Sequence, residues 1–265
     1  MIAQPSLRSV VYGDEEVDLD DPAERYHEAS KLYPALAARQ TAGIVQLAGS
    51  ATLQAVSAHA VKRNLQLPTV PLPPALHPRT SLWLAIERRR SSRAFEGSPL
   101  RLQALATLLD AGYGTVAPTR RAVPSGGALY PLELFVFARR VEGLTATVCH
   151  FDPERRVLEV LCERDVSTEL DAASAFPGLL DRAAAAVFVG AVFWRTRFKY
   201  GQRGYRFALL EAGHVMQNIL LAATALGVPA LPLGGFYDDR VDTLLGLNGV
   251  DESALYGVVL GGEQR

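Results

Sequence analysis

The sequence has few cysteines, and this scarcity excludes several classes of protein. Among 265 residues only Cys149 and Cys162 occur. Two cysteines cannot build the disulfide framework of a small secreted domain, so a reduced cytoplasmic protein is the expectation. The two residues fall on opposite arms of a predicted hairpin, where we expect them to pack as small apolar side chains.

Excess charge of one sign and long apolar runs are also missing. The formal net charge is -1, which argues against a general affinity for nucleic acid or for an acidic membrane surface. No apolar run in the sequence reaches the length of a membrane span. Residues 1–5 (MIAQP) lack a basic region followed by an apolar one, so no signal peptide is expected. The sequence therefore predicts neither nucleic-acid binding nor membrane association.

The chain does have a high apolar content and a change of composition after residue 67. Apolar residues make up 49% of the sequence, which is enough for the core of one large domain. Residues 1–67 are predicted to be mainly helical, with Asp21 capping a helix that starts at Pro22. The proline-rich residues 68–74 indicate an extended connector. We therefore divide the chain into an N-terminal helical extension with its linker (1–78) and a main domain (79–265).

The main domain mixes helical and strand patterns without a regular alternation. Helices are predicted at 81–88 after a Thr80 cap, at 102–109 before Gly112 and Gly114, and at 204–226 before Gly227. Strands are predicted at 132–137, 185–192, 230–235 and 255–261, with a hairpin formed by 146–151 and 156–161. This order favours an α+β domain with a mostly antiparallel sheet over a regular βαβ array.

Two segments early in this domain have the composition of ligand-binding loops. Residues 88–95 (RRRSSRAF) interleave arginines with serines, and forked guanidinium donors beside hydroxyls suit a phosphate. A solvated basic helix end, stabilised by the helix dipole, explains the same pattern. Residues 124–131 (PSGGALYP) carry two glycines that would let the backbone approach a flat ligand. A tight turn before a strand is the alternative explanation there.

Two further segments lie in the C-terminal half of the chain. Residues 231–236 (LPLGGF) again permit a close backbone approach, or form only a turn at the end of a strand. Lys199 and Tyr200 stand side by side before the long helix, with Arg203 and Arg206 following. An adjacent lysine and tyrosine can handle protons when they are partly buried. An ordinary exposed basic loop is the alternative, and the residues alone leave both explanations open.

Two other patterns predict no site. Residues 112–117 (GYGTVA) fit the GxGxxA dinucleotide pattern, but they follow a helix, and Pro118 blocks the helix start that such a motif needs. We interpret them as a helix stop. Glu211 and His214 share one helical face as a metal pair would, but no third ligand is in view. No metal site is predicted.

Taken in order, the four candidate segments resemble the flavin-dependent nitroreductase superfamily. They are more similar to its SagB-type, or McbC-like, branch of azoline (thiazoline/oxazoline) dehydrogenases. The resemblance runs from about residue 80 onward and reaches residues 26–31 (YHEASK), which are similar to a short N-terminal motif of SagB-type proteins. Each motif alone is weak, but their ordered occurrence together with the Lys-Tyr pair and the Glu-Ala-Gly-His helix is specific.

The resemblance implies a nitroreductase-like fold, in which a mostly antiparallel sheet is flanked by helices and two copies form an intertwined homodimer with FMN at the subunit interface. The residues that it assigns to FMN are Arg89, Ser91 and Arg93, the loop residues Pro124, Ser125, Gly126 and Gly127 of the partner copy, and Leu233, Gly234 and Gly235. The helix around Gln217 and Asn218 matches a long interface helix. Many nitroreductases complete the phosphate clamp with a C-terminal Lys/Arg pair, whereas residues 260–265 here hold only Arg265. The clamp is then expected to rest on Arg89 and Arg93, with Arg265 or Arg240.

The resemblance also assigns catalysis to Lys199 and Tyr200. Oxidation of an azoline to an azole removes a proton and a hydride from adjacent ring carbons, and FMN accepts the hydride. Tyr200 is expected to be the base, with the Lys199 ammonium favouring its phenolate form. Oxygen is the expected final electron acceptor.

The expected substrate is an azoline-containing peptide or a carrier-bound equivalent, with a cyclodehydratase or an assembly-line protein as a partner. Two other functions stay open. One is an NAD(P)H-dependent reductase of nitro compounds, quinones or free flavin, which would share the fold and FMN. The other is a non-catalytic scaffold subunit of a biosynthetic complex, for which the N-terminal extension would suit docking.

Overall fold

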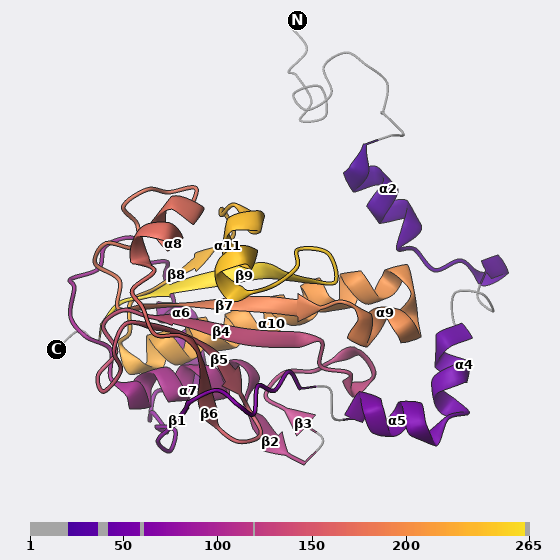
Figure 1. The fold of residues 1–265 in the computed structure, drawn as a ribbon, viewed down its shortest axis with the longest axis horizontal. Coiled ribbons are helices and arrows are strands. Elements are labelled where there is room, and N and C mark those ends of the chain that lie inside the picture. Colours follow the sequence, from indigo (N-terminus) through magenta and orange to yellow (C-terminus); the bar gives the residue numbers. More distant parts are fainter. Residues whose placement is uncertain (1–20, 37–41, 59–60, 119, 263–265) are drawn as a thin grey trace, which may run out of the picture.

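The computed structural model describes residues 21–36, 42–58, 61–118 and 120–262, and a seven-stranded sheet forms its centre (Figure 1). The strand order is β1-β6-β5-β4-β7-β9-β8, and every neighbouring pair is antiparallel. The strands are β1 (Thr69–Pro71), β4 (Leu132–Ala138), β5 (Thr147–Asp152), β6 (Val157–Cys162), β7 (Ala185–Val192), β8 (Ala230–Leu233) and β9 (Glu252–Leu260). A separate ribbon pairs β2 (Thr115–Ala117) with β3 (Arg120–Arg121). The predicted α+β fold with an antiparallel sheet is confirmed.

Helices cover both faces of this sheet. The helical elements are α2 (Pro22–Ala29), η1 (Pro34–Leu36), α4 (Ala42–Ala48), α5 (Ala51–Ala58), α6 (Leu82–Arg88), α7 (Leu102–Tyr113), η2 (Gly126–Ala128), α8 (Ser167–Ala173), α9 (Trp194–Tyr200), α10 (Gln202–Leu226) and α11 (Asp238–Leu245). The helices α7 and α10 share one buried cluster with the sheet, whereas α8 and α11 share the other. The sheet is therefore the middle of three layers.

The central strands explain why their sequences are apolar without interruption. Every residue of β4 is buried, and successive side chains point to opposite faces. Leu134 and Val136 pack in the cluster with α7 and α10, whereas Phe135 and Phe137 pack in the cluster with α8 and α11. Each fully buried side chain of this size stabilises the fold by roughly 1.5–3 kcal/mol. A polar substitution on either face of β4 would thus disrupt a core.

Several helix boundaries differ from their predictions. Ser81, rather than Thr80, caps α6, because its hydroxyl oxygen accepts a hydrogen bond of 3.2 Å from the backbone N–H of Leu84. The helix predicted to end at Gly112 and Gly114 continues past Gly112 to Tyr113, and Gly114 caps it. The short helices α9 and α11 were not predicted, because segments of seven and eight residues carry too little periodic signal.

The N-terminal region follows its predicted pattern in the described residues. The carboxylate of Asp21 accepts a hydrogen bond of 2.7 Å from the backbone N–H of Ala23, which is the predicted cap of α2. The proline-rich connector is extended and also supplies the edge strand β1, in which Thr69 lies opposite Glu159 of β6. The segment expected to link two parts of the chain thus belongs to the sheet of the main domain, and the division at residues 78 and 79 stays a prediction.

Candidate functional site

The residues Lys199 and Tyr200 form the C-terminal end of α9, in a short helix where the sequence had suggested only a loop. Gly201 ends this helix with φ 56° and ψ -135°, a conformation that favours glycine. The chain turns there and enters α10 at Gln202. The Lys-Tyr pair is therefore held at an elbow between two helices.

The glycine loop lies directly against this elbow. Gly127 has φ 67°, and a Cβ atom added to it would lie 2.5 Å from the Tyr200 hydroxyl oxygen and 2.6 Å from Lys199 Nζ. The neighbouring residues Ala128 and Tyr130 also have positive φ values, of 54° and 44°. Such backbone angles in residues with side chains cost energy and occur most often at functional sites. Two segments more than seventy residues apart in the sequence thus meet at the tips of the predicted catalytic pair.

Aromatic side chains pack against both the Lys-Tyr pair and the glycine loop. The rings of Tyr200 and Phe207 meet edge to face, with centroids 5.0 Å apart. The ring of Phe207 also lies under Gly126, where an added Cβ would be 3.1 Å from its Cδ2 atom. Lys199 Nζ lies 5.2 Å from the centroid of the Tyr200 ring, within the range of a cation–π contact. Both the glycine loop and the Lys-Tyr pair therefore pack against the first two turns of α10.

A buried acid lies below the loop. Glu211 of α10 accepts a hydrogen bond of 2.8 Å from the hydroxyl of Tyr113, which in turn accepts one from the backbone N–H of Leu132. Burial raises the pKa of Glu211 to about 7, although Ser125, Tyr113 and the charge of Arg121 oppose this shift. Its Oε2 atom has no hydrogen-bond partner in the described part of the chain. The sequence interpretation missed this role, and the available signal was an acid on the apolar face of a helix.

The arginine–serine element lies at the other end of the molecule, where it borders an open cavity of about 360 Å³. The backbone N–H of Ser92 donates to the carbonyl of Ala230, so the element runs beside the start of β8. The lining residues are Arg88, Arg90, Ser92, Thr224, Gly227, Val228, Pro229 and Ala230. The residues singled out from the sequence, Arg89, Ser91 and Arg93, are the alternate members of the same segment and are not among them.

The Gly-Gly turn follows β8 and also leaves its backbone accessible. A Cβ atom added to Gly234 would meet no atom within 4 Å, whereas one on Gly235 would be 2.9 Å from the ring of Phe176. Leu233 is buried as the last residue of β8. An exposed glycine backbone can approach a flat ligand, so Gly234 fits the predicted contact with a flavin ring.

The long helix α10 separates these two groups of residues. The Lys-Tyr pair precedes its first turn, and Thr224 near its last turn lines the cavity beside the arginines. A helix of 25 residues is about 37 Å long. In Figure 1, α9 lies to the right of the label of α10 and α6 lies to its left. One bound mononucleotide cannot contact both ends of α10 in the same chain.

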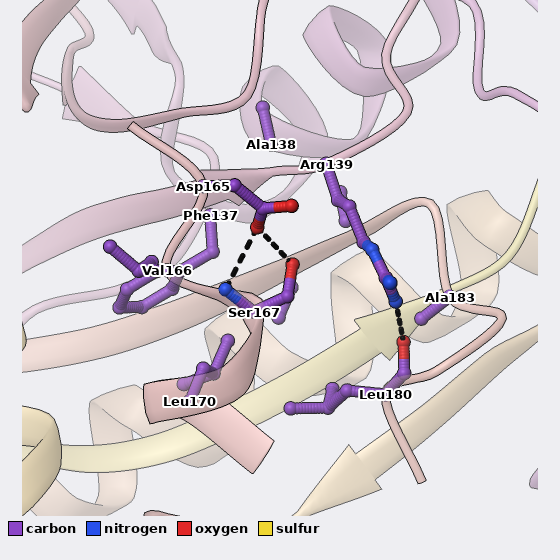
Figure 2. Close-up of a pocket in the computed structure, with 11 residues that line it drawn as sticks. Phe137, Ala138, Arg139, Asp165, Val166, Ser167, Leu170, Leu180 and Ala183 are labelled. Atoms are coloured by element: carbon purple, nitrogen blue, oxygen red, sulfur yellow. Dashed lines mark hydrogen bonds between the residues drawn. The ribbon is translucent and has the colours of Figure 1, made fainter. Parts of the chain in front are cut away.

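A second, much smaller cavity lies away from both groups of residues. It measures about 20 Å³, which is room for one water molecule, and it is mostly apolar. Figure 2 shows Ser167 donating to Asp165 and Arg139 donating to the carbonyl of Leu180 at its rim. Ala138 and Ala185 face each other there, at the end of β4 and β7 opposite to the glycine loop. This cavity has no room for a substrate.

Neither cysteine supplies a reactive group to the site. Cys149 is fully buried, and burial raises the pKa of its thiol to about 11. Both cysteines are free and lie on β5 and β6 as predicted. Within the described residues, no group of three or more His, Cys, Asp or Glu side chains could hold a metal ion.

Comparison with known protein families identifies relatives of the chain. The model of the nitroreductase family matches residues 86–262. A nitroreductase-like protein of Methanocaldococcus jannaschii is 37% identical over 159 residues, which cover 60% of this chain and 80% of the relative. The microcin B17-processing protein McbC of Escherichia coli is 30% identical, and the trifolitoxin-processing protein TfxB of Rhizobium leguminosarum bv. trifolii is 31% identical. Each match covers 56% of this chain, but only 57% of McbC and 41% of TfxB.

Solved structures share the fold. A nitroreductase-like protein of Anabaena variabilis superposes with a TM-score of 0.66 at 26% identity, over 80% of this chain and 47% of that chain. A chain of the E. coli microcin synthetase McbBCD complex matches at a TM-score of 0.59 and 23% identity, over 99% of both chains. A Desulfovibrio desulfuricans relative solved with FMN matches at a TM-score of 0.51 and 21% identity, over 71% of this chain and 88% of that chain.

Proposed function

The chain belongs to the nitroreductase family, and we propose that it is an FMN-dependent dehydrogenase that oxidises azoline rings to azoles during the biosynthesis of a peptide natural product. The observation that carries this proposal is the convergence of the Lys199 and Tyr200 side chains over Gly127. A reductase needs no protein base at that point, whereas the removal of a proton from a substrate carbon does. The similarity to two processing proteins of peptide pathways supports the same choice.

The residues present fit the binding of FMN, the cofactor recorded in a related structure. The phosphate would be held by Arg89, Ser91 and Arg93, and the ring would lie against Leu233, Gly234 and Gly235. The fit rests on the open backbone at Gly234 and on arginines whose guanidinium groups have no hydrogen bond or ion pair within the described part of the chain. The loop from Pro124 to Gly127 packs near the start of α10, whereas the arginine segment lies beside its last turn. A second copy of the chain would therefore supply the loop, which makes the proposed enzyme a homodimer.

In the proposed reaction, the protein orients the azoline ring and removes one proton from it. Tyr200 as the phenolate accepts this proton from a ring carbon, so that the carbon–hydrogen bonding electrons remain in the ring. The Lys199 ammonium lies beside this side chain, with Nζ 5.2 Å from the centroid of the Tyr200 ring. Bound FMN supplies the two-electron acceptor that receives the hydride from the adjacent carbon. The ring thus loses two hydrogen atoms and becomes aromatic.

The proposed substrates are azoline-containing peptides or carrier-bound equivalents. The enzyme that forms an azoline by cyclodehydration is a proposed partner, because its product would be the substrate here. A chain similar to this one is part of the McbBCD complex, which supports a shared assembly. We further propose that this enzyme works in the cytoplasm.

A second candidate is an NAD(P)H-dependent reductase of nitro compounds, quinones or free flavin. The 37% identity to a nitroreductase-like archaeal protein favours it, because that relative is matched over 80% of its length. Both candidates would bind FMN in the same way. They differ in whether Tyr200 is needed for turnover.

The test begins with the absorbance spectrum of the purified protein and continues with an azoline peptide incubated in air. The proposal expects a yellow protein and a product that has lost two hydrogen atoms per ring by mass spectrometry. Rapid bleaching by NADPH with turnover of a nitroaromatic compound, and no azole, would establish the reductase instead. A colourless protein that binds no added FMN would leave only a scaffold role.

A further inference from the structure

The N-terminal extension contacts the helical elbow that carries the predicted catalytic pair. We propose that α2, α4 and residues 61–64 act together as a positioning element for Lys199 and Tyr200. This inference rests on the proposed function, because it concerns the same site. It assigns a task to the extension, which lies before the residues that match the nitroreductase family model.

The closest of these contacts is between α4 and α9. A Cβ atom added to Gly43 would collide with the carbonyl oxygen of Phe198 and would lie 2.9 Å from the Cα atom of Lys199. Gly43 therefore brings backbone against backbone at the catalytic lysine itself. A larger residue would force α4 and α9 apart. The shift would then move Lys199, whose side chain lies against Gly127. Small displacements of a reacting group lower turnover strongly.

The motif at residues 26–31 holds the other arm of the elbow. The carbonyl of Ser30 accepts a hydrogen bond of 3.0 Å from Arg203, and its hydroxyl accepts one from Arg206. The ring of Tyr26 meets Tyr205 edge to face, with centroids 5.6 Å apart, and Tyr205 stacks on Phe193 at 4.5 Å. These partners lie on the first turns of α10 and just before α9. The motif that resembles SagB-type proteins thus binds the start of α10 directly, and through Tyr205 it is linked to Phe193 before α9.

Residues 61–64 complete the arrangement through one buried carboxylate. Glu133 Oε1 accepts a hydrogen bond of 2.8 Å from the backbone N–H of Lys62 and pairs with Arg195 of α9 at 2.6 Å. Burial opposes ionisation, but the hydrogen bond from His150 and the charges of Arg195 and His150 lower the pKa of Glu133 to about 2. The anionic carboxylate therefore joins the end of the extension to α9. Arg195 also donates to the carbonyl of Tyr130 at 3.4 Å, which links α9 to the glycine loop.

The helices α2 and α4 bury too little apolar surface for a role in core packing alone. Within its described residues, α2 has no buried residue, and Leu47 of α4 is buried with 9% of its surface exposed. Ser30 is the most buried of these residues, at 1% exposed, and its polar atoms bond to α10. The contacts of α2, Ser30 and α4 are polar, aromatic or backbone to backbone, and they fall on α9 and α10. Residues 62–64 pair with the sheet as well, at Asp152, Glu154, Glu159 and Glu252. This pattern indicates positioning of the elbow.

The main test compares two glycines of the extension in the full-length protein. Gly43→Ala places a methyl group against Lys199, whereas Gly49→Ala places one at ordinary contact distance, 3.5 Å from the carbonyl of Val45. We expect Gly43→Ala to lower kcat for azoline oxidation by about tenfold to a hundredfold, with KM and FMN content unchanged. Gly49→Ala should match the wild type. Equal kcat in both variants would overturn the inference, as would a matching loss of FMN.

A second pair of variants does not depend on fitting a new methyl group. Ser30→Ala removes the hydroxyl that binds Arg206, whereas Lys31→Ala removes an exposed neighbour whose side chain pairs with Glu28 on the surface. Hydrogen exchange of residues 194–206 should speed up in Ser30→Ala and stay unchanged in Lys31→Ala. No difference in exchange would contradict the positioning role, whatever the substrate proves to be. If the wild type forms no azole, the proposed function fails, while this exchange result still decides the inference.

Discussion

The residues at the two ends of α10 differ in how fully they are packed and paired within one chain. At the N-terminal end, side chains and strained backbone are already packed together, with Tyr200 and Lys199 over Gly127. At the C-terminal end, Arg88 and Arg90 line an open cavity, and their guanidinium groups have no hydrogen bond or ion pair to any described residue. The contrast separates two tasks. In the proposed enzyme, the reacting groups would be held by the chain itself, whereas the arginine segment at residues 88–93 would be left available for an anion.

The largest effect is expected from the reactive end of α10. Tyr200→Phe removes the proposed base, and we expect the rate of azole formation to fall by about a hundredfold to ten-thousandfold. Lys199→Ala should cause a loss of similar order. Both variants should keep bound FMN, measured by absorbance of the purified protein, because the proposed phosphate contacts Arg89, Ser91 and Arg93 lie at the other end of α10. Full activity in both would remove the catalytic assignment.

The packing of the reactive end can be tested at a single glycine. Gly127→Ala puts a methyl group within 2.5 Å of the Tyr200 hydroxyl, and we expect kcat to fall by about a hundredfold. Gly143→Ala is the matched control, since Gly143 also has a positive φ, 80°, but its added methyl meets nothing within 4 Å. Both should lose about 1–2 kcal/mol of stability from the backbone alone, measured by urea unfolding. A similar kcat in the two variants would show that crowding at Gly127 does not matter.

The arginines beside the last turn of α10 can be tested as two sets, Arg89 with Arg93 and Arg88 with Arg90. Neutralising Arg89 and Arg93 to Gln should weaken FMN binding by about tenfold or more, because a charge-assisted hydrogen bond contributes about 1.5–3 kcal/mol. The binding of riboflavin, which has no phosphate, should change little. Replacing Arg88 and Arg90 by Gln removes the same charge from the lining of the cavity. A greater loss of FMN affinity in that variant, by fluorescence titration, would move the phosphate into the cavity.

An effect on stability alone, and only at higher pH, is expected from the acid beneath the loop. The folded-state pKa of Glu211, about 7, is above its ordinary value of 4.5, so the folded protein binds this proton more tightly than the unfolded chain. The resulting stability is fully present below about pH 4.5 and is lost as pH rises through 7, by at most about 3 kcal/mol. Urea unfolding between pH 5 and 8 should show this slope in the wild type. Glu211→Gln should flatten it, and an unchanged slope would exclude Glu211 as its source.

Much of the fold could be predicted because the deciding signals are local. The apolar runs that became β4 and β7, and the long apolar segment that Gly227 ends, each specify an element by themselves. The short helix α9 has polar and aromatic residues without a clear period, so the sequence did not reveal it. The contact between Gly127 and Tyr200 depends on the register of the whole sheet, which no single segment encodes. From the sequence, Glu211 was compared only with His214, which shares its helical face. Its hydrogen-bond partner, Tyr113, is 98 residues away in the sequence and was not considered.

The length of α10 has a consequence for mixtures of chains. In the proposed homodimer, each FMN would be bound by the arginines of one copy and faced by the Lys-Tyr pair of the other. A copy with Tyr200→Phe and a copy with Arg89 and Arg93 replaced would each be defective as a homodimer. Their mixed dimer would contain one site made entirely of intact residues and one made entirely of altered ones. Co-expressed variants should then complement each other, and a variant that stays monomeric should have no working site at all.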